Sequence, residues 1–192
     1  ELPGESGGIL RPPSEWDGRT LYTTTFGQGY ALNSVQAASV MATLGNDGVR
    51  VEPTLVSGFT GADGIFHEAD RAAPEQVVRP EVARTLVRML ESVTNGGSGY
   101  LAAVDGYRVA AKTGTAELGS GGTVSNMVAL FPADEPRLAI SVVLYKPTKL
   151  YKASETAAPL VRQIVTDSVR VLNIPPSTEA PKLFANEPGK GA

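Results

Sequence analysis

The chain has 192 residues, of which 42% are hydrophobic and 19% are charged, and its net charge is −3. This composition can build one folded domain or a large part of one, and it excludes a disordered polyelectrolyte. The acidic balance argues against nucleic acid as the main partner. The lack of cysteine excludes disulfides and a thiol nucleophile, and a single histidine, His67, excludes a zinc site made of several imidazoles.

The N-terminal part contains one segment without periodicity and one clear helix. Residues 1–29 are rich in glycine and proline and predict a loop, and the abrupt start at Glu1 suggests that the chain opens inside a larger domain. Residues 34–44 predict a helix, because Asn33 and Gln36 form a capping-box pattern at its start. Its small and apolar residues lie on nearly every side, so we expect this helix to be buried.

A hairpin and a second helix are predicted next. Residues 49–57 and 64–68 have the composition of short strands around a glycine-rich turn, which indicates a peripheral hairpin. The second helix begins at Pro80, a favoured first helical position. It carries one apolar stripe at helical spacing and ends at the Asn-Gly-Gly of residues 95–97.

Three strands in close succession dominate the C-terminal half. The segments are residues 107–117, 126–131 and 138–146, and their short connections favour an antiparallel meander. The third segment is apolar on both faces and should be central. We expect the last helix, residues 156–172, to cover one face of the sheet, and helices upstream of this chain to cover the other.

These elements predict an α+β fold in which an antiparallel sheet is flanked by helices. Residues 1–174 form the folded part. Residues 175–192 contain four prolines and few large apolar groups, so a disordered tail is expected there.

The segment that indicates chemistry is Lys112-Thr113-Gly114-Thr115, inside the first of the three strands. Glycine is unfavourable within a strand and often marks the close approach of another backbone. A cation, two hydroxyls and a bare backbone suit an extended peptide with a terminal carboxylate, which would add to the sheet edge as a strand. A backbone N–H at the same edge could stabilise a developing oxyanion.

Together with five other segments, Lys112-Thr113-Gly114-Thr115 makes the chain resemble the class B penicillin-binding proteins, specifically the division-specific transpeptidases. The resemblance implies the penicillin-binding protein/serine β-lactamase-like fold. It rests on the order and spacing of six segments: Leu2-Pro3-Gly4-Glu5-Ser6, Phe26-Gly27-Gln28-Gly29, residues 36–48, Met89-Leu90-Glu91-Ser92-Val93, Gly106-Tyr107-Arg108 and Lys112-Thr113-Gly114-Thr115.

The resemblance assigns a role to each residue of the last segment. Lys112 helps to hold the substrate carboxylate and polarises a serine, while the hydroxyls of Thr113 and Thr115 bind that carboxylate. The Thr115 N–H forms half of the oxyanion hole, and Gly114 keeps the strand open for the incoming peptide. For Arg108 two interpretations stay open, a substrate contact in the same cleft or a surface ion pair.

The family's other two motifs, Ser-x-x-Lys and Ser-x-Asn, do not occur in this sequence. We therefore expect both to precede it, and we expect the isolated chain, as the C-terminal part of a transpeptidase domain, to be inactive. The implied reaction is D,D-transpeptidation of peptidoglycan stem peptides during cell division, without metal or organic cofactor. The implied partners are stem peptides, β-lactams, a membrane glycosyltransferase and other division proteins, on the extracytoplasmic face of the bacterial membrane.

Two other functions stay open. One is a β-lactam-sensing or non-catalytic peptide-binding relative, and the other is a serine β-lactamase, which would need a deacylating base. The remaining candidates have simpler interpretations. His67 belongs to the hairpin, Asp134 and Glu135 form a solvated turn, and the lysines of residues 146–152 form a solvated strand end rather than a surface for an anionic polymer or membrane.

Overall fold

The computed structural model describes residues 3–177 and 179. Its centre is a three-stranded antiparallel sheet of β5 (Ala110–Glu117), β6 (Thr123–Phe131) and β7 (Leu138–Tyr145), in the order β5-β6-β7. The predicted meander is therefore confirmed, and the fold is α+β. β6 is the central strand, whereas the sequence suggested β7, because the described part of the chain places no strand beyond β7.

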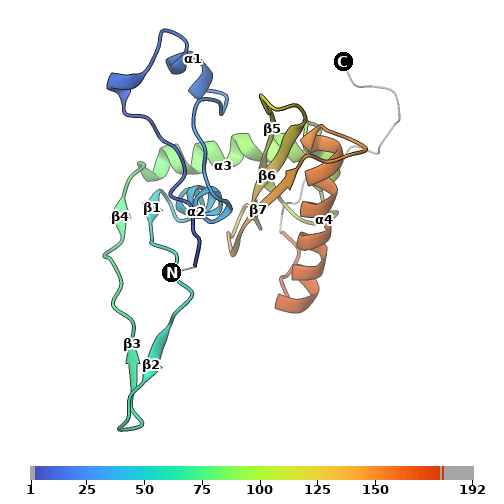
Figure 1. The fold of residues 1–192 in the computed structure, drawn as a ribbon. Helices are drawn as coiled ribbons and strands as arrows, with labels where there is room; N and C mark the ends of the chain where they lie inside the picture. Colours follow the sequence, from blue (N-terminus) through green and yellow to red (C-terminus); the bar gives the residue numbers. More distant parts are fainter. Residues whose placement is uncertain (1–2, 178, 180–192) are drawn as a thin grey trace.

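One face of the sheet packs against the last helix, α4 (Ala153–Leu172), as predicted (Figure 1). The side chains of Met127, Phe131, Val161 and Val165 are fully buried between the two layers. Complete burial of a large apolar side chain contributes roughly 1.5–3 kcal/mol, so this contact is a main source of stability.

The opposite face packs against α2 (Ser34–Gly45) and α3 (Pro80–Thr94). Met41 of α2, Val87 of α3 and Leu130 of β6 are buried together there. The expectation that this face waits for upstream helices was wrong, because α2 contacts both β6 and β7. In Figure 1 the sheet lies between α4 on one side and α2 and α3 on the other.

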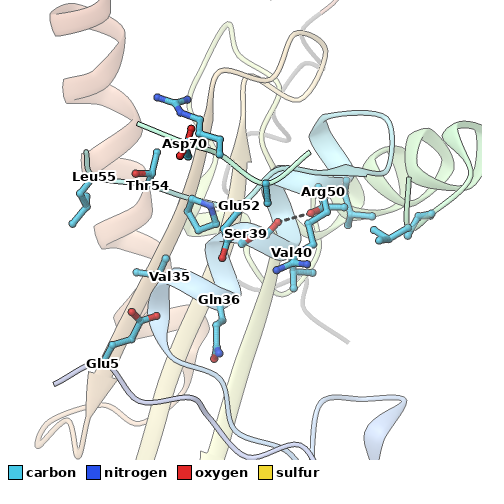
Figure 2. Close-up of a pocket in the computed structure, with 17 residues that line it drawn as sticks. Glu5, Val35, Gln36, Ser39, Val40, Arg50, Glu52, Thr54, Leu55 and Asp70 are labelled. Carbon is cyan, nitrogen blue, oxygen red and sulfur yellow. Dashed lines mark hydrogen bonds between the residues drawn. The ribbon is translucent and has the colours of Figure 1, made fainter. Parts of the chain in front are cut away.

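The start of α2 is the predicted capping box. The Asn33 side chain accepts a hydrogen bond from the Gln36 N–H at 2.8 Å, and the Gln36 side chain accepts one from the Asn33 N–H at 2.9 Å. The expected burial on all sides was wrong, since Val35 and Val40 are 41% and 53% exposed. They line a hollow of about 620 Å³ between α2 and the extended segments around Glu52 and Asp70 (Figure 2).

The part of the chain that precedes β5 is made of short elements, apart from α2 and α3. Residues 49–78 form a long arm that extends away from the main sheet and ends in a two-stranded hairpin (Figure 1). A hairpin is therefore present around the predicted glycine-rich turn, but its first strand is Gly58–Thr60, outside the predicted residues 49–57, and it pairs with Phe66–Glu68. Of residues 49–57 only Val49–Arg50 forms a strand, and its partner is Glu75–Gln76. The short elements are η1 (Pro13–Glu15), α1 (Thr20–Thr24), β1 (Val49–Arg50), β2 (Gly58–Thr60), β3 (Phe66–Glu68), β4 (Glu75–Gln76) and η2 (Tyr100–Ala102).

Several element boundaries differ from the prediction. β6 begins at Thr123 rather than at residue 126. α4 begins at Ala153 rather than at residue 156, so Pro159 lies inside the helix. β5 begins at Ala110 rather than at residue 107, because the preceding backbone bonds to groups outside the sheet. One of these bonds runs from the hydroxyl of Thr94 to the carbonyl of Val109, at 2.6 Å.

The chain after α4 turns back onto the fold. Asn173, in the left-handed conformation with φ of 49°, ends the helix. Ser177 then donates its backbone N–H to the carbonyl of Gly106 at 3.0 Å, so residues 175–177 of the predicted tail are attached to the domain. Residues 178 and 180–192 of that tail lie outside the described residues. No helix in the described ranges is long and apolar enough to cross a membrane.

Candidate active site

One edge of β5 is open in the described part of the chain. β6 pairs with the other edge through a regular register from Ala110 to Glu117. Leu118 donates its N–H to the carbonyl of Gly122 at 2.9 Å, so Leu118 and Gly122 are a hydrogen-bonded pair. Hydrogen-bonded and non-hydrogen-bonded pairs alternate along an antiparallel ladder. Because Thr113 and Thr115 lie an odd number of residues before Leu118, their backbone groups point away from β6 and toward the open edge. The edge therefore offers two N–H donors to an incoming strand.

The ammonium group of Lys112 lies at the same edge. Its Nζ donates a hydrogen bond to the carbonyl of Thr113 at 2.7 Å, and that carbonyl points toward the open edge. The side chain is exposed and forms no ion pair with any described residue. A cation without a countercharge is free to attract an anionic ligand, such as a carboxylate.

The two hydroxyls of the motif lie on the α4 side of the sheet. The Oγ1 of Thr113 is 3.0 Å from the Oγ of Ser98, and the Oγ1 of Thr115 accepts a hydrogen bond from the N–H of Ala153 at 3.0 Å. The Thr115 hydroxyl keeps its own proton for a further hydrogen bond. Because side chains alternate along a strand, Lys112 and Gly114 belong to the opposite face.

Gly114 has a neighbour that leaves no room for a side chain. A Cβ at this position would lie 2.5 Å from the Oδ1 of Asn126, its partner on β6. This contact is an alternative reason for the glycine, beside the close approach of a substrate backbone. Asn126 shares a face with Lys112 and Gly114, so its amide is a polar group of the candidate site.

Arg108 does not join Lys112 at the open edge. Its guanidinium forms two hydrogen bonds of 2.7 Å with the carboxylate of Glu91 on α3. These bonds raise the pKa of Arg108 above its ordinary value. The two side chains are 26% and 14% exposed, so this is a half-buried, bidentate pair beside a polar hollow of about 520 Å³. Of the two interpretations from the sequence, the structure contains the ion pair.

Sequence reasoning missed Ser98 and Asn126. Ser98 belongs to the glycine-rich connection after α3, and the pattern there indicated only the end of a helix. Asn126 was treated as an ordinary strand residue. The available signal was Gly114 itself, since a glycine within a strand implies that something is close, without saying what.

The other titratable candidates do not gather at this edge. The His67 ring stacks on Phe59 at a centroid distance of 5.2 Å, in the β2–β3 hairpin far from β5 (Figure 1). Asp134 accepts a hydrogen bond from the hydroxyl of Ser177 at 2.8 Å. Among the described residues, no group of three or more histidine and carboxylate side chains could hold a metal ion.

An open strand edge with a cation and outward N–H groups can bind an extended peptide that ends in a carboxylate. Comparison with known proteins identifies the family of the chain. Residues 1–166 match the penicillin binding protein transpeptidase domain family. The chain therefore belongs to the penicillin binding protein transpeptidase domain family.

Two curated relatives show which members of this family are similar to the chain. The chain is 34% identical to the penicillin-binding protein PbpB of Mycolicibacterium smegmatis, with 93% of this chain and 30% of the relative covered. It is also 34% identical to the peptidoglycan D,D-transpeptidase FtsI of Escherichia coli, with 91% and 29% covered. The chain thus spans about 30% of the length of the curated relatives that it matches.

Solved structures share the fold. Penicillin-binding protein 3 of Mycobacterium tuberculosis, in complex with aztreonam, has a TM-score of 0.84 at 31% identity, and the match covers 94% of this chain and 44% of that one. The transpeptidase domain of penicillin-binding protein 3 from Burkholderia pseudomallei has a TM-score of 0.76 at 31% identity, with 93% and 54% covered. The sequence-based assignment to the penicillin-binding fold is confirmed.

Proposed function

We propose that this chain is the C-terminal part of a serine D,D-transpeptidase that cross-links peptidoglycan stem peptides. The observation that carries the proposal is the open edge of β5, where the ammonium of Lys112 lies beside the outward backbone groups of Thr113 and Thr115. Membership of the transpeptidase family supports the same reaction class.

In the proposed reaction, a stem peptide adds to β5 as an extended strand. The ammonium of Lys112 and the hydroxyl of Thr113 hold its terminal carboxylate, and Thr115 contributes its remaining hydroxyl proton. The bare backbone of Gly114 lets the peptide approach. These contacts bring the carbonyl of the penultimate D-alanine to the N–H of Thr115.

The nucleophile is a serine on polypeptide that precedes this chain, in a Ser-x-x-Lys motif. Its oxygen attacks the D-alanine carbonyl, and the negative charge on the carbonyl oxygen is stabilised by the N–H of Thr115 and the serine's own N–H. The C–N bond then breaks, terminal D-alanine leaves with a proton, and an ester to the serine remains. An amine of a neighbouring stem peptide attacks this ester, which forms the cross-link and restores the serine hydroxyl.

This chemistry needs no metal or organic cofactor. The proposed substrate also implies where the protein works and which proteins it works with. The substrate lies outside the cytoplasm, so we propose the outer face of the bacterial cytoplasmic membrane as the location. A membrane glycosyltransferase would supply the glycan strands. The division-specific subtype is favoured by the six segments described above.

The proposal is tested by labelling the full-length protein with a fluorescent penicillin. We expect one covalent adduct per chain in the unmodified protein and none in Lys112→Ala. Lys112→Arg should also fail, because a planar guanidinium does not replace a compact ammonium. Lys149→Ala is the matched control, since Lys149 is another exposed lysine outside the site.

The same experiment separates the alternatives. Normal labelling of Lys112→Ala would refute the assigned role of Lys112. Rapid hydrolysis of the adduct would identify a β-lactamase, and the absence of any adduct in the unmodified protein would identify a relative without a nucleophile. A stable adduct without cross-linking of stem peptides would identify a sensor.

A further inference from the structure

Helix α4 runs along β5 in the opposite direction and is attached near both of its ends. Near the end of β5, the N–H of Ala153, the first residue of the helix, donates to the Oγ1 of Thr115 at 3.0 Å. Before the start of β5, the hydroxyl of Tyr107 donates to the carbonyl of Ile174, just after the helix, also at 3.0 Å. Figure 1 shows the helix beside the sheet.

The helix and the extended segment from Tyr107 to Thr115 have similar lengths. At about 1.5 Å per residue, the 20 residues of α4 span roughly 30 Å. The eight steps from Tyr107 to Thr115 span about 26 Å in a strand, at roughly 3.3 Å per step. The inner face of the helix is fixed against the sheet, since Val161 and Val165 are fully buried. The helix is therefore a rigid spacer between the two attachment points.

Ser177 closes the attachment before the start of β5 with three hydrogen bonds. Its N–H donates to the carbonyl of Gly106 at 3.0 Å, and its Oγ accepts from the N–H of Arg108 at 3.1 Å. The same Oγ donates to the carboxylate of Asp134 at 2.8 Å. Asp134 lies in the connection between β6 and β7, so one hydroxyl joins the C-terminal segment, the start of β5 and the neighbouring strands.

The other edge of this segment is held by α3. The hydroxyl of Thr94 binds the carbonyl of Val109 at 2.6 Å, and Glu91 holds the guanidinium of Arg108. The backbone before Ala110 is thus bound on both edges, whereas β5 beyond it has a neighbouring strand on one edge only. The orientation of the open edge depends on how firmly these two ends are held.

From this geometry we infer that Ser177 is a positioning residue for the proposed transpeptidase site. The inference rests on the proposed function. Ser177 holds one end of β5 while the start of α4 holds Thr115 at the other, and Lys112 lies between the two attachment points. Loss of the Ser177 hydroxyl lets the start of β5 shift relative to α4, which moves the Lys112 ammonium and the Thr115 N–H away from the positions that acylation needs. Small displacements of such groups lower reaction rates strongly.

The test uses three variants of the full-length protein. Ser177→Ala removes the hydroxyl, and Ser177→Thr retains it. Ser168→Ala is the control, because Ser168 is also half-buried, lies on α4, and its hydroxyl bonds to no described residue. Stopped-flow labelling with a fluorescent penicillin gives the non-covalent dissociation constant and the acylation rate constant separately. Hydrogen exchange of the full-length protein, followed in a proteolytic peptide that contains residues 112–116, reports the mobility of the open edge.

For Ser177→Ala we expect the acylation rate constant to fall by about fivefold to tenfold, the value of roughly one hydrogen bond, with little change in the dissociation constant. Exchange of residues 112–116 should become faster. Ser177→Thr should restore both, and Ser168→Ala should change neither.

Unchanged acylation and exchange in Ser177→Ala, even with a lower melting temperature, would overturn the inference and leave Ser177 a purely structural contact. An equal effect of Ser168→Ala would overturn it as well. Failure of the unmodified protein to acylate would instead refute the proposed function. Exchange would then still show whether Ser177 holds β5.

Discussion

Replacement of Gly114 by alanine gives a sharp test of why the motif contains glycine. The added Cβ would lie 2.5 Å from the Oδ1 and 2.9 Å from the Nδ2 of Asn126, closer than atoms of these types approach one another. Asn126 must therefore rotate away. Such overpacking costs about 1–3 kcal/mol, and the lower backbone entropy of alanine in the unfolded chain recovers roughly 0.5–1 kcal/mol.

The net cost is about 1 kcal/mol, which would lower the melting temperature of a domain of 150–250 residues by roughly 2–4 °C and that of the larger full-length protein by less. Asn126→Ala removes the colliding amide, and in that background Gly114→Ala should no longer be destabilising. The four proteins form a double-mutant cycle, measured by thermal melting of the full-length protein.

Penicillin acylation of the same four proteins separates the two explanations for the glycine. If Asn126 alone requires the glycine, the double variant is as stable as Asn126→Ala and is acylated at the same rate as Asn126→Ala. If the substrate backbone also requires it, the double variant is stable but reacts slowly. Equal destabilisation by Gly114→Ala in both backgrounds would show that the contact with Asn126 does not matter, and would refute the argument from the structure.

Substitutions at three further positions test other contacts of the fold. Arg108→Ala should lower the free energy of unfolding by about 2 kcal/mol, because it leaves the carboxylate of Glu91 half-buried and unpaired. Chemical denaturation of Arg108→Ala, Glu91→Ala and the double variant measures the coupling between the two side chains. Thr94→Val should cost about 1–2 kcal/mol by leaving a strand carbonyl without its donor, whereas Thr94→Ser should retain most of the stability. Hydrogen bonds from Arg84 lower the pKa of Asp47 below its ordinary value of 3.8, so the pair stabilises the fold above that pH and loses its effect as the pH falls through the lowered pKa. The melting difference between the unmodified protein and Asp47→Asn should therefore vanish in strong acid; a difference that persists there would contradict the assignment.

Local patterns predicted most of the elements. The capping box at Asn33 and Gln36 and the apolar run of β7 are properties of neighbouring residues, and both were found at the expected positions. The layer opposite α4 was predicted wrongly. The sequence shows that β7 is apolar on both faces, but it does not show that α2, about a hundred residues earlier, returns to cover one of them.

The position of the motif was predicted better than its surroundings, and the roles of its residues stay predictions. The motif indicated a strand edge with a cation, which the structure contains. The partners of the individual groups could not be predicted, because Ser98, Asn126 and Ala153 reach the motif from three other parts of the chain. The start of β5 was misplaced for the same reason, since its backbone bonds to Thr94 and Ser177 depend on tertiary structure.

The side chains of the motif alternate between the two faces of the sheet, and this arrangement affects how the reactivity of the motif can change. Lys112 and Gly114 face the layer of α2 and α3, while Thr113 and Thr115 face α4. A small sliding of one layer against the other would therefore alter the distance between a cation and a hydroxyl that are close neighbours in sequence. Substitutions deep in either helical layer could tune the affinity for an anionic ligand without touching a single residue that binds it.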